Sequence, residues 1–136
     1  VNIDHPEVAA LADELHQDRL LTFAFDREAQ LIGHELSEGP DGVSFHVTER
    51  SSGDHAEVKL QLLGRHNAVN ALSAIGAAMA AGVPLAESAN ALARFTGLRR
   101  RLDRVGEAGG VTIYDDFGHN PDKIAATLDA LHAFPG

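Results

Sequence analysis

The chain contains no cysteine among its 136 residues. It therefore has no disulfide framework, no thiolate nucleophile and no cysteine-ligated metal site. Long hydrophobic runs are missing too: the longest, Ala74–Val83, is about half the length that a helix needs to cross a bilayer. The opening residues lack the basic and apolar regions of a signal peptide. These absences favour a cytoplasmic protein that has no membrane partner.

An excess of positive charge is also absent, since the formal net charge is −9 at pH 7. Nucleic-acid phosphates attract positively charged proteins, so we expect no nucleic-acid partner. Five of the 11 Lys and Arg residues nevertheless fall within one short segment, Arg94–Arg104. A local positive site in an acidic protein suits a compact anionic ligand better than a polymer.

Three common catalytic signatures do not occur in the sequence: a G-x-x-x-x-G-K-[ST] phosphate loop, a G-x-S-x-G nucleophile turn and an H-E-x-x-H metal helix. With 44% hydrophobic and 23% charged residues, the composition is that of a globular protein. The chain starts at Val1 without a methionine, and it stops at Phe134-Pro135-Gly136, where a βαβ unit would continue. We therefore expect a piece of a longer polypeptide.

The first half predicts one helix and several strands. Helical spacing of apolar residues predicts a helix over Pro6–His16. The apolar run Arg19–Phe25 has the length of a strand, and Gln30–Leu36 is a weaker strand candidate. In Gly42–Thr48 and Glu57–Leu62, apolar and polar residues alternate as they do in half-buried strands. Turn-forming segments separate these runs, so we predict an antiparallel meander with one face in water.

The second half begins with two predicted helices. An alanine-rich segment predicts a helix over Asn67–Ala81, in which Asn67 and Asn70 lie opposite the apolar face. Gly82 and Pro84 are expected to end this helix and to start another over Leu85–Phe95.

A strand–loop–helix unit is predicted to follow. Gly110–Asp116 has the pattern of a strand, with Asp115 and Asp116 at its carboxyl end. Asn120 is a suitable N-cap and Pro121 a suitable first residue for the next helix. In open α/β sheets, ligands bind at the carboxyl ends of strands. The apolar stripe of this helix is expected at Ile124, Leu128 and Leu131.

The segment "GRHNAVN", Gly64–Asn70, places polar side chains at a strand-to-helix junction. Asn67 and Asn70 are one helical turn apart and so lie on the same side. An amide side chain has both a donor and an acceptor, which suits reading the edge of a heterocycle such as adenine. The alternative is that Asn67 caps the helix and Asn70 is a surface residue.

Two further segments carry charged groups. "RRRLDR", Arg99–Arg104, is either a solvated charge run or a phosphate site, because arginine binds phosphate through a planar fork. "DDFGH", Asp115–His119, is either a divalent-metal site or an aspartate pair held by local hydrogen bonds. Adjacent carboxylates repel each other unless a cation, an arginine or backbone donors compensate. The other histidines show no ligand spacing and are predicted on the surface: His5, His16, His34, His46, His55 and His132.

In this order and at this spacing, "GRHNAVNALSAIGAA", "FTGLRRRLDRVGE" and "YDDFGHNPDKIAATLDAL" resemble consecutive signatures of the Mur ligases. Members of that family use ATP to join amino acids or peptides to a UDP-N-acetylmuramyl precursor of peptidoglycan. The resemblance covers the whole chain and is greatest to the UDP-N-acetylmuramate–L-alanine ligases and the ligases that recycle murein tripeptide. It implies an ATP-dependent, amide-forming ligase that works through an acyl phosphate.

The resemblance also implies an α/β fold with two parts. Residues 1–97 would be the later half of the central ATPase domain, a mixed sheet with an antiparallel meander and helices. Residues 98–136 would open a Rossmann-like C-terminal domain with its first βα unit, and the hinge would lie near Gly97. The phosphate loop and the main Mg²⁺ ligands would lie upstream of Val1, so this piece should be inactive alone. The implied partners are ATP, Mg²⁺, UDP-N-acetylmuramate, an amino acid or peptide, and the rest of the polypeptide.

Nucleotide-binding residues follow from the match of individual positions. His66, Asn67 and Asn70 match the positions at the adenine end of ATP. Arg101 matches the hinge arginine that reaches the phosphates, and Asp116 matches the aspartate that the C-terminal domain contributes. No metal ligand is expected in this piece.

Arg101, Asp116 and His119 form the catalytic set that the resemblance implies. One position departs from the family pattern: Asn120 stands where the branch usually has a second histidine, and an amide cannot relay a proton as imidazole can. Which amine is joined, and in which branch, is left open. Two alternatives are a metal-dependent phosphohydrolase that uses Asp115, Asp116 and His119, and a noncatalytic nucleotide-binding homologue.

Overall fold

The computed structural model describes residues 1–16 and 20–132. A four-stranded sheet is formed by β1 (Phe23–Ala24), β2 (Leu31–Gly39), β3 (Gly42–Glu49) and β4 (His55–Leu60), which pair in that order. β1 runs parallel to β2, whereas the β2–β3 and β3–β4 pairs are antiparallel. The predicted mixed α/β fold with an antiparallel meander is confirmed.

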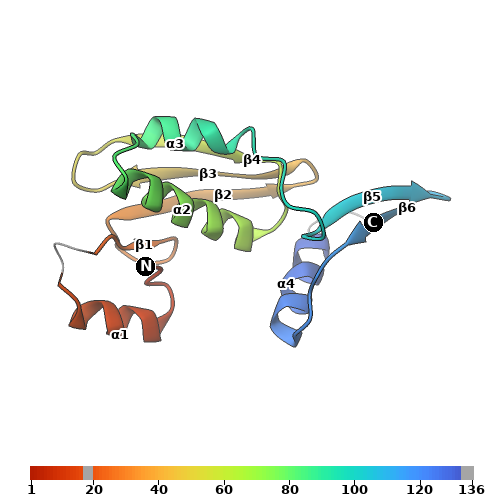
Figure 1. Cartoon of the computed structure of the whole chain (residues 1–136), viewed down its shortest axis with the longest axis horizontal. Coiled ribbons are helices and arrows are strands. Elements are labelled where there is room, and N and C mark those ends of the chain that lie inside the picture. The colour runs from red at the N-terminus through yellow and green to blue at the C-terminus, as the bar shows by residue number, and fades with distance from the viewer. Residues whose placement is uncertain (17–19, 133–136) are drawn as a thin grey trace.

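Two helices, α2 (Arg65–Ala80) and α3 (Leu85–Leu92), cover one face of this sheet (Figure 1). The alternation in β3 explains which face they cover, because Val43, Phe45 and Val47 are all buried in the core with residues of both helices. Leu72 and Ile75 of α2 are buried against them. The sheet and these two helices thus form one hydrophobic core.

The opposite face of the sheet is polar, as the alternation predicts. His34 of β2 stacks on its cross-strand partner His46, with ring centroids 5.8 Å apart. His46 is half-buried by this contact, and the other five histidines predicted on the surface are exposed.

Three predicted elements in the first half end earlier than predicted. The strand predicted over Arg19–Phe25 is reduced to the two residues of β1, and Arg19 lies outside the described residues. The chain leaves the sheet there because the Phe25 and Asp26 amides donate to the Asp4 carboxylate, at 2.8 and 3.0 Å. Helix α1 (Pro6–Glu14) ends two residues early, and β4 ends at Leu60 rather than Leu62.

The second part of the chain begins with the linker, residues 93–102, because α3 ends at Leu92 instead of the predicted Phe95. It continues with β5 (Asp103–Ala108), β6 (Val111–Asp115) and α4 (Pro121–His132), which lie beside the sheet unit (Figure 1). The predicted strand is β6. β5 pairs with it antiparallel and was not predicted. Asn120 caps α4 as predicted, since its Oδ1 accepts the Lys123 amide at 2.9 Å.

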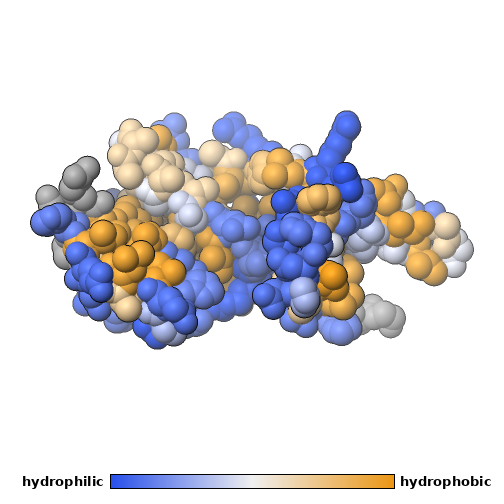
Figure 2. Space-filling model, turned by 60° about the horizontal axis from the view of Figure 1, so that its bottom comes forward, coloured by the Kyte–Doolittle hydropathy of each residue, from blue (hydrophilic) through white to orange (hydrophobic). Residues whose placement is uncertain are grey.

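Apolar side chains remain exposed on this second part. Val105, Val111 and Ile113 of the hairpin are exposed, and the apolar surface is visible over the hairpin in Figure 2. The predicted stripe of α4 is also largely uncovered, with Ile124 and Leu128 about half exposed, while Ala130 is the buried residue of this helix. No helix within residues 1–16 and 20–132 is long and apolar enough to span a membrane.

Candidate functional site

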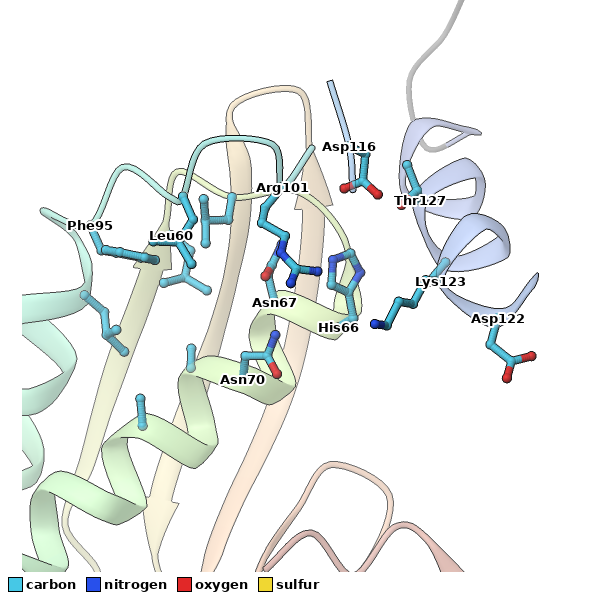
Figure 3. Close-up of a pocket in the computed structure, with 16 residues that line it drawn as sticks. Leu60, His66, Asn67, Asn70, Phe95, Arg101, Asp116, Asp122, Lys123 and Thr127 are labelled. Atoms are coloured by element: carbon cyan, nitrogen blue, oxygen red, sulfur yellow. The ribbon is translucent and has the colours of Figure 1, made fainter. Parts of the chain in front are cut away.

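A pocket of about 720 Å³ lies between α2 and α4 and is bordered by the linker (Figure 3). One wall comes from the end of β4, α2 and the end of α3, and the other comes from α4. The lining residues are Leu60, Leu62, His66, Asn67, Asn70, Ala71, Ala74, Leu92, Phe95, Leu98, Arg101, Asp116, Asp122, Lys123, Ala126 and Thr127.

The five residues predicted from the sequence to contact a nucleotide all line this pocket. His66, Asn67 and Asn70 lie on α2, Arg101 lies in the linker, and Asp116 lies directly after β6. The fold therefore gathers polar groups that are separated by up to 50 residues in the sequence.

The sixth predicted residue, His119, does not line the pocket. Its Nδ1 lies 3.1 Å from the Phe117 carbonyl oxygen, and its ring contacts the Phe117 ring with centroids 5.3 Å apart. In the described arrangement His119 is therefore apart from the other five residues.

The pocket combines an apolar wall with amide side chains. Leu60, Leu62 and Phe95 contribute to this wall, next to the small side chains of Ala71 and Ala74 on α2. A flat heterocycle can lie against such a surface while amide groups bind its polar edge. The small residues let a ligand approach the α2 backbone closely.

Asn67 and Asn70 occupy the same side of α2, as their spacing predicts, and neither is the helix N-cap. α2 begins at Arg65, so the alternative interpretation of Asn67 as a cap is wrong. Asn67 Nδ2 donates to the Leu63 carbonyl oxygen at 2.8 Å, which fixes the amide and leaves its Oδ1 as the group that a ligand can reach.

Gly64 permits the sharp entry into α2. Its φ of 87° lies in the left-handed region that glycine adopts most easily. A Cβ atom at this position would lie 2.8 Å from the Cβ of Ala130 and 2.9 Å from the His66 ring. Gly64 therefore allows α4 and the His66 imidazole to pack against the start of α2.

We expect Gly64→Ala to lower the stability of the protein more than Gly53→Ala does. Gly53 also has a positive φ, 76°, but a Cβ there would meet nothing within 4 Å, so this control isolates backbone strain. Backbone strain should lower the free energy of unfolding by about 1 kcal/mol in either variant. At Gly64 alone, overpacking should lower it by about 1–3 kcal/mol more. Urea unfolding of the full-length protein measures both variants. Equal losses would contradict the packing between α4 and α2.

The linker is attached to the loop after β6 through Asp116. Asp116 Oδ2 accepts the Leu102 amide at 2.8 Å, and its Oδ1 accepts the Gly118 amide at 2.7 Å. The Phe117 amide donates to the Arg100 carbonyl at 2.9 Å, and the Arg100 guanidinium lies 5.0 Å from the Phe117 ring centroid. These contacts tie linker residues on both sides of Arg101 to one loop.

Backbone strain accompanies this attachment. Arg100 and Leu102 have φ values of 62° and 49°, which are uncommon for residues with a Cβ. Such conformations persist only where surrounding contacts hold them. They flank Arg101, whose side chain points toward Asn67 and His66 in Figure 3. The strained linker therefore orients Arg101 into the pocket.

The same contacts explain how two adjacent carboxylates coexist. Asp116 is compensated by two backbone amides, and Asp115 Oδ2 lies 3.9 Å from Arg100 Nε. This matches the predicted need for an arginine or backbone donors. Across residues 1–16 and 20–132, no group of three His, Asp or Glu side chains is arranged to hold a metal ion. The geometry thus favours the aspartate pair held by hydrogen bonds over the metal-site interpretation.

His66 is predicted to be neutral at pH 7. Desolvation of the imidazole lowers its pKa below the ordinary 6.5, although the negative charges of Asp116 and Glu38 oppose that shift. As the pH falls, the His66 imidazole is therefore protonated in the unfolded chain before it is protonated in the folded protein. The free energy of unfolding should decrease as the pH drops from about 6.5 to the pKa of His66 in the folded protein. NMR titration, with the signal assigned through His66→Gln, measures the value. Asp116→Asn should lower the pKa further, and a pKa above 6.5 would contradict the desolvation.

Sequence reasoning missed several residues of the pocket, above all Lys123 and Thr127 on α4 and Phe95 in the linker. Lys123, Thr127 and Ala130 are spaced so that they share one side of α4. That side carries both polar and small residues, so it does not stand out as an apolar or a polar stripe. Helical spacing alone does not show that this side of α4 faces α2, because that depends on the approach of Ala130 to Gly64.

Comparison with known proteins places the chain in a family. The Mur ligase middle domain matches residues 1–78, and the Mur ligase glutamate ligase domain matches residues 100–136. A UDP-N-acetylmuramate–L-alanine ligase of Rhodospirillum rubrum is 41% identical over 133 residues, which cover 94% of this chain and 28% of that protein. The chain thus spans somewhat more than a quarter of the length of such relatives.

Solved structures agree with this relationship. UDP-N-acetylmuramate–alanine ligase of Thermotoga maritima superposes with a TM-score of 0.72 at 26% identity, covering 83% of this chain and 26% of that one. A murein peptide ligase of Psychrobacter arcticus superposes with a TM-score of 0.63 at 28% identity, covering 93% of this chain and 26% of that one. On the matched domains and the sequence identity together, the chain belongs to the Mur ligase family.

Proposed function

We propose that this chain is part of an ATP-dependent ligase that adds an amino acid or peptide to UDP-N-acetylmuramate in peptidoglycan synthesis or recycling, in the cytoplasm. Residues 1–97 would belong to its central ATP-binding domain and residues 98–136 to its C-terminal domain. The rest of the same polypeptide would supply the phosphate loop.

The observation that carries this proposal is the convergence of His66, Asn67, Asn70, Arg101 and Asp116 on one pocket. These residues come from segments before and after the linker, so a ligand bound among them would contact both parts of the chain. The apolar wall and the amides suit an adenine ring, and the arginine suits a phosphate. No other described feature of the molecule offers this combination.

The residues present fit ATP but do not fit a magnesium site. Asp116 uses both carboxylate oxygens on backbone amides, and the described residues hold no cluster of three potential metal ligands. We therefore assign no Mg²⁺ ligand to this piece and propose that the full-length protein supplies them elsewhere.

The chemistry assigns a role to each group. ATP would phosphorylate a substrate carboxylate and leave as ADP. The amine would then attack the acyl phosphate, and the amide would form as inorganic phosphate leaves. Asn67 and Asn70 would hold the adenine edge, with neutral His66 beside them. Arg101 would bind phosphate oxygens, where negative charge accumulates during transfer. Asp116 would keep the linker in the conformation that directs Arg101 inward.

The experiment that tests this function is ADP release by the full-length protein. Release should require both UDP-N-acetylmuramate and an amino acid or peptide, and mass spectrometry should detect the amide product. ADP release without any acceptor would favour the phosphohydrolase alternative. ATP binding without ADP release under any acceptor would favour a noncatalytic homologue. A panel of amines would also decide between the alanine-adding and recycling branches.

A further inference from the structure

Lys123 is a cation of the pocket to which neither the sequence motifs nor the proposed roles assign a task. It lies in the first turn of α4, and its side chain points across the pocket toward His66 and Asn70 (Figure 3). The only other lysine of the chain, Lys59, is paired on the surface with Glu57 at 2.9 Å. The two lysines thus have different surroundings.

The ammonium group of Lys123 has no carboxylate within 4.0 Å in the described part of the chain. Two carboxylates line the pocket, but Asp116 accepts two backbone amides and Asp122 points away from Lys123 (Figure 3). Arg101, across the pocket, likewise has no ion pair among the described residues. Two cations without counter-ions therefore face one cavity that also has an apolar wall.

Lys123 and Arg101 are both exposed at the rim of the pocket, so an anionic ligand can reach both charges. Phosphate oxygens are strong acceptors for lysine, which acts on them as a compact point charge. Lys123 and Arg101 come from different segments, so an anionic ligand between them would be bound from two sides.

We propose that Lys123 binds a phosphate group of the nucleotide in this pocket, as a second cation beside Arg101. This inference rests on the proposed ATP-binding function and adds to it a contact from α4. It predicts that Lys123 recognises the phosphates and not the adenosine part of the ligand. The charge of Lys123, more than its packing, should determine how tightly the protein binds ATP.

The test is calorimetric binding to the full-length protein with Mg-ATP and, separately, adenosine. Lys123→Gln should weaken ATP binding about tenfold, as expected for loss of one charge-assisted hydrogen bond. Adenosine affinity should stay within about twofold, since adenosine has no phosphate. Lys123→Arg should recover most of the ATP affinity, and Lys59→Gln, the matched surface lysine, should leave both ligands unchanged.

The outcomes separate this inference from the function on which it rests. If the wild-type protein does not bind ATP, the proposed function fails. If it binds ATP and Lys123→Gln binds it equally well, the inference about Lys123 alone is overturned. Equal weakening of ATP and adenosine would show that Lys123 supports the pocket wall instead. Weakening of UDP-N-acetylmuramate binding alone would assign the anion to that substrate and also overturn the proposal.

Discussion

Arg101→Ala should reduce turnover by about 100- to 1,000-fold in the ligase that we propose, the usual effect of removing one preorganised group that stabilises transition-state charge. Arg101 lines the pocket, and its backbone is held between two residues with positive φ, which directs its side chain into the pocket before a ligand arrives. The loss should appear in kcat, because charge on the phosphoryl oxygens grows during transfer. Steady-state ADP release measures it.

Arg99→Ala is the matched control for this prediction. Arg99 is an exposed arginine two positions away in the same linker and does not line the pocket. Its replacement removes the same charge from the chain and should leave turnover within about twofold. If Arg101→Ala retained full turnover, or if both variants lost activity equally, the pocket would not be the place where Arg101 acts.

Asp116→Ala should release the linker. It removes two hydrogen bonds to a charged acceptor, each worth about 1.5–3 kcal/mol, and leaves Leu102 in an unfavourable conformation without its partner. Amide exchange at Leu102 and Gly118 should accelerate on the order of 100-fold. ADP release should fall as well, because Arg101 would no longer be directed into the pocket. Hydrogen-exchange mass spectrometry and turnover measure the two effects.

Asp115→Ala supplies the comparison for Asp116. Its carboxylate is exposed and lies 3.9 Å from Arg100 Nε, so its loss should change stability by less than about 1 kcal/mol. Asp116→Asn, which keeps one acceptor oxygen, should fall between the two alanine variants. Unchanged exchange at Leu102 in Asp116→Ala would show that the carboxylate does not hold the linker.

Hydropathy patterns in the sequence predicted those helices and strands that bury one face and expose the other. Val43, Phe45 and Val47 alternate with polar residues because one face of β3 packs on α2 and α3. β5 was missed since Asp103–Ala108 is mostly exposed, contains Gly106 and shows no apolar alternation. Among the described residues its main contact is the pairing with β6. Pairing leaves no trace in the hydropathy of a strand that is exposed on both sides.

Residues of the pocket could be predicted from the sequence where a motif or helical spacing places them. They could not be predicted where tertiary packing brings them to the pocket. Asn67 and Asn70 share a side of α2 because of helical spacing alone. That Lys123 joins them depends on how α4 packs against Gly64 through Ala130. No local pattern contains that information. Likewise, nothing in the order of residues shows that Asp116 Oδ2 holds the linker by accepting the Leu102 amide.

The placement of the pocket between two segments joined by a short linker has a reciprocal consequence. A nucleotide that touches both walls favours their juxtaposition. If a second substrate favours the same juxtaposition, each ligand increases the affinity of the protein for the other by the same factor. Order of addition could then arise without direct contact between the two molecules. Its strength would depend on how far each ligand favours the juxtaposition of the two walls, so substitutions that loosen the linker, such as Asp116→Ala, would weaken cooperation between ligands as well as each affinity.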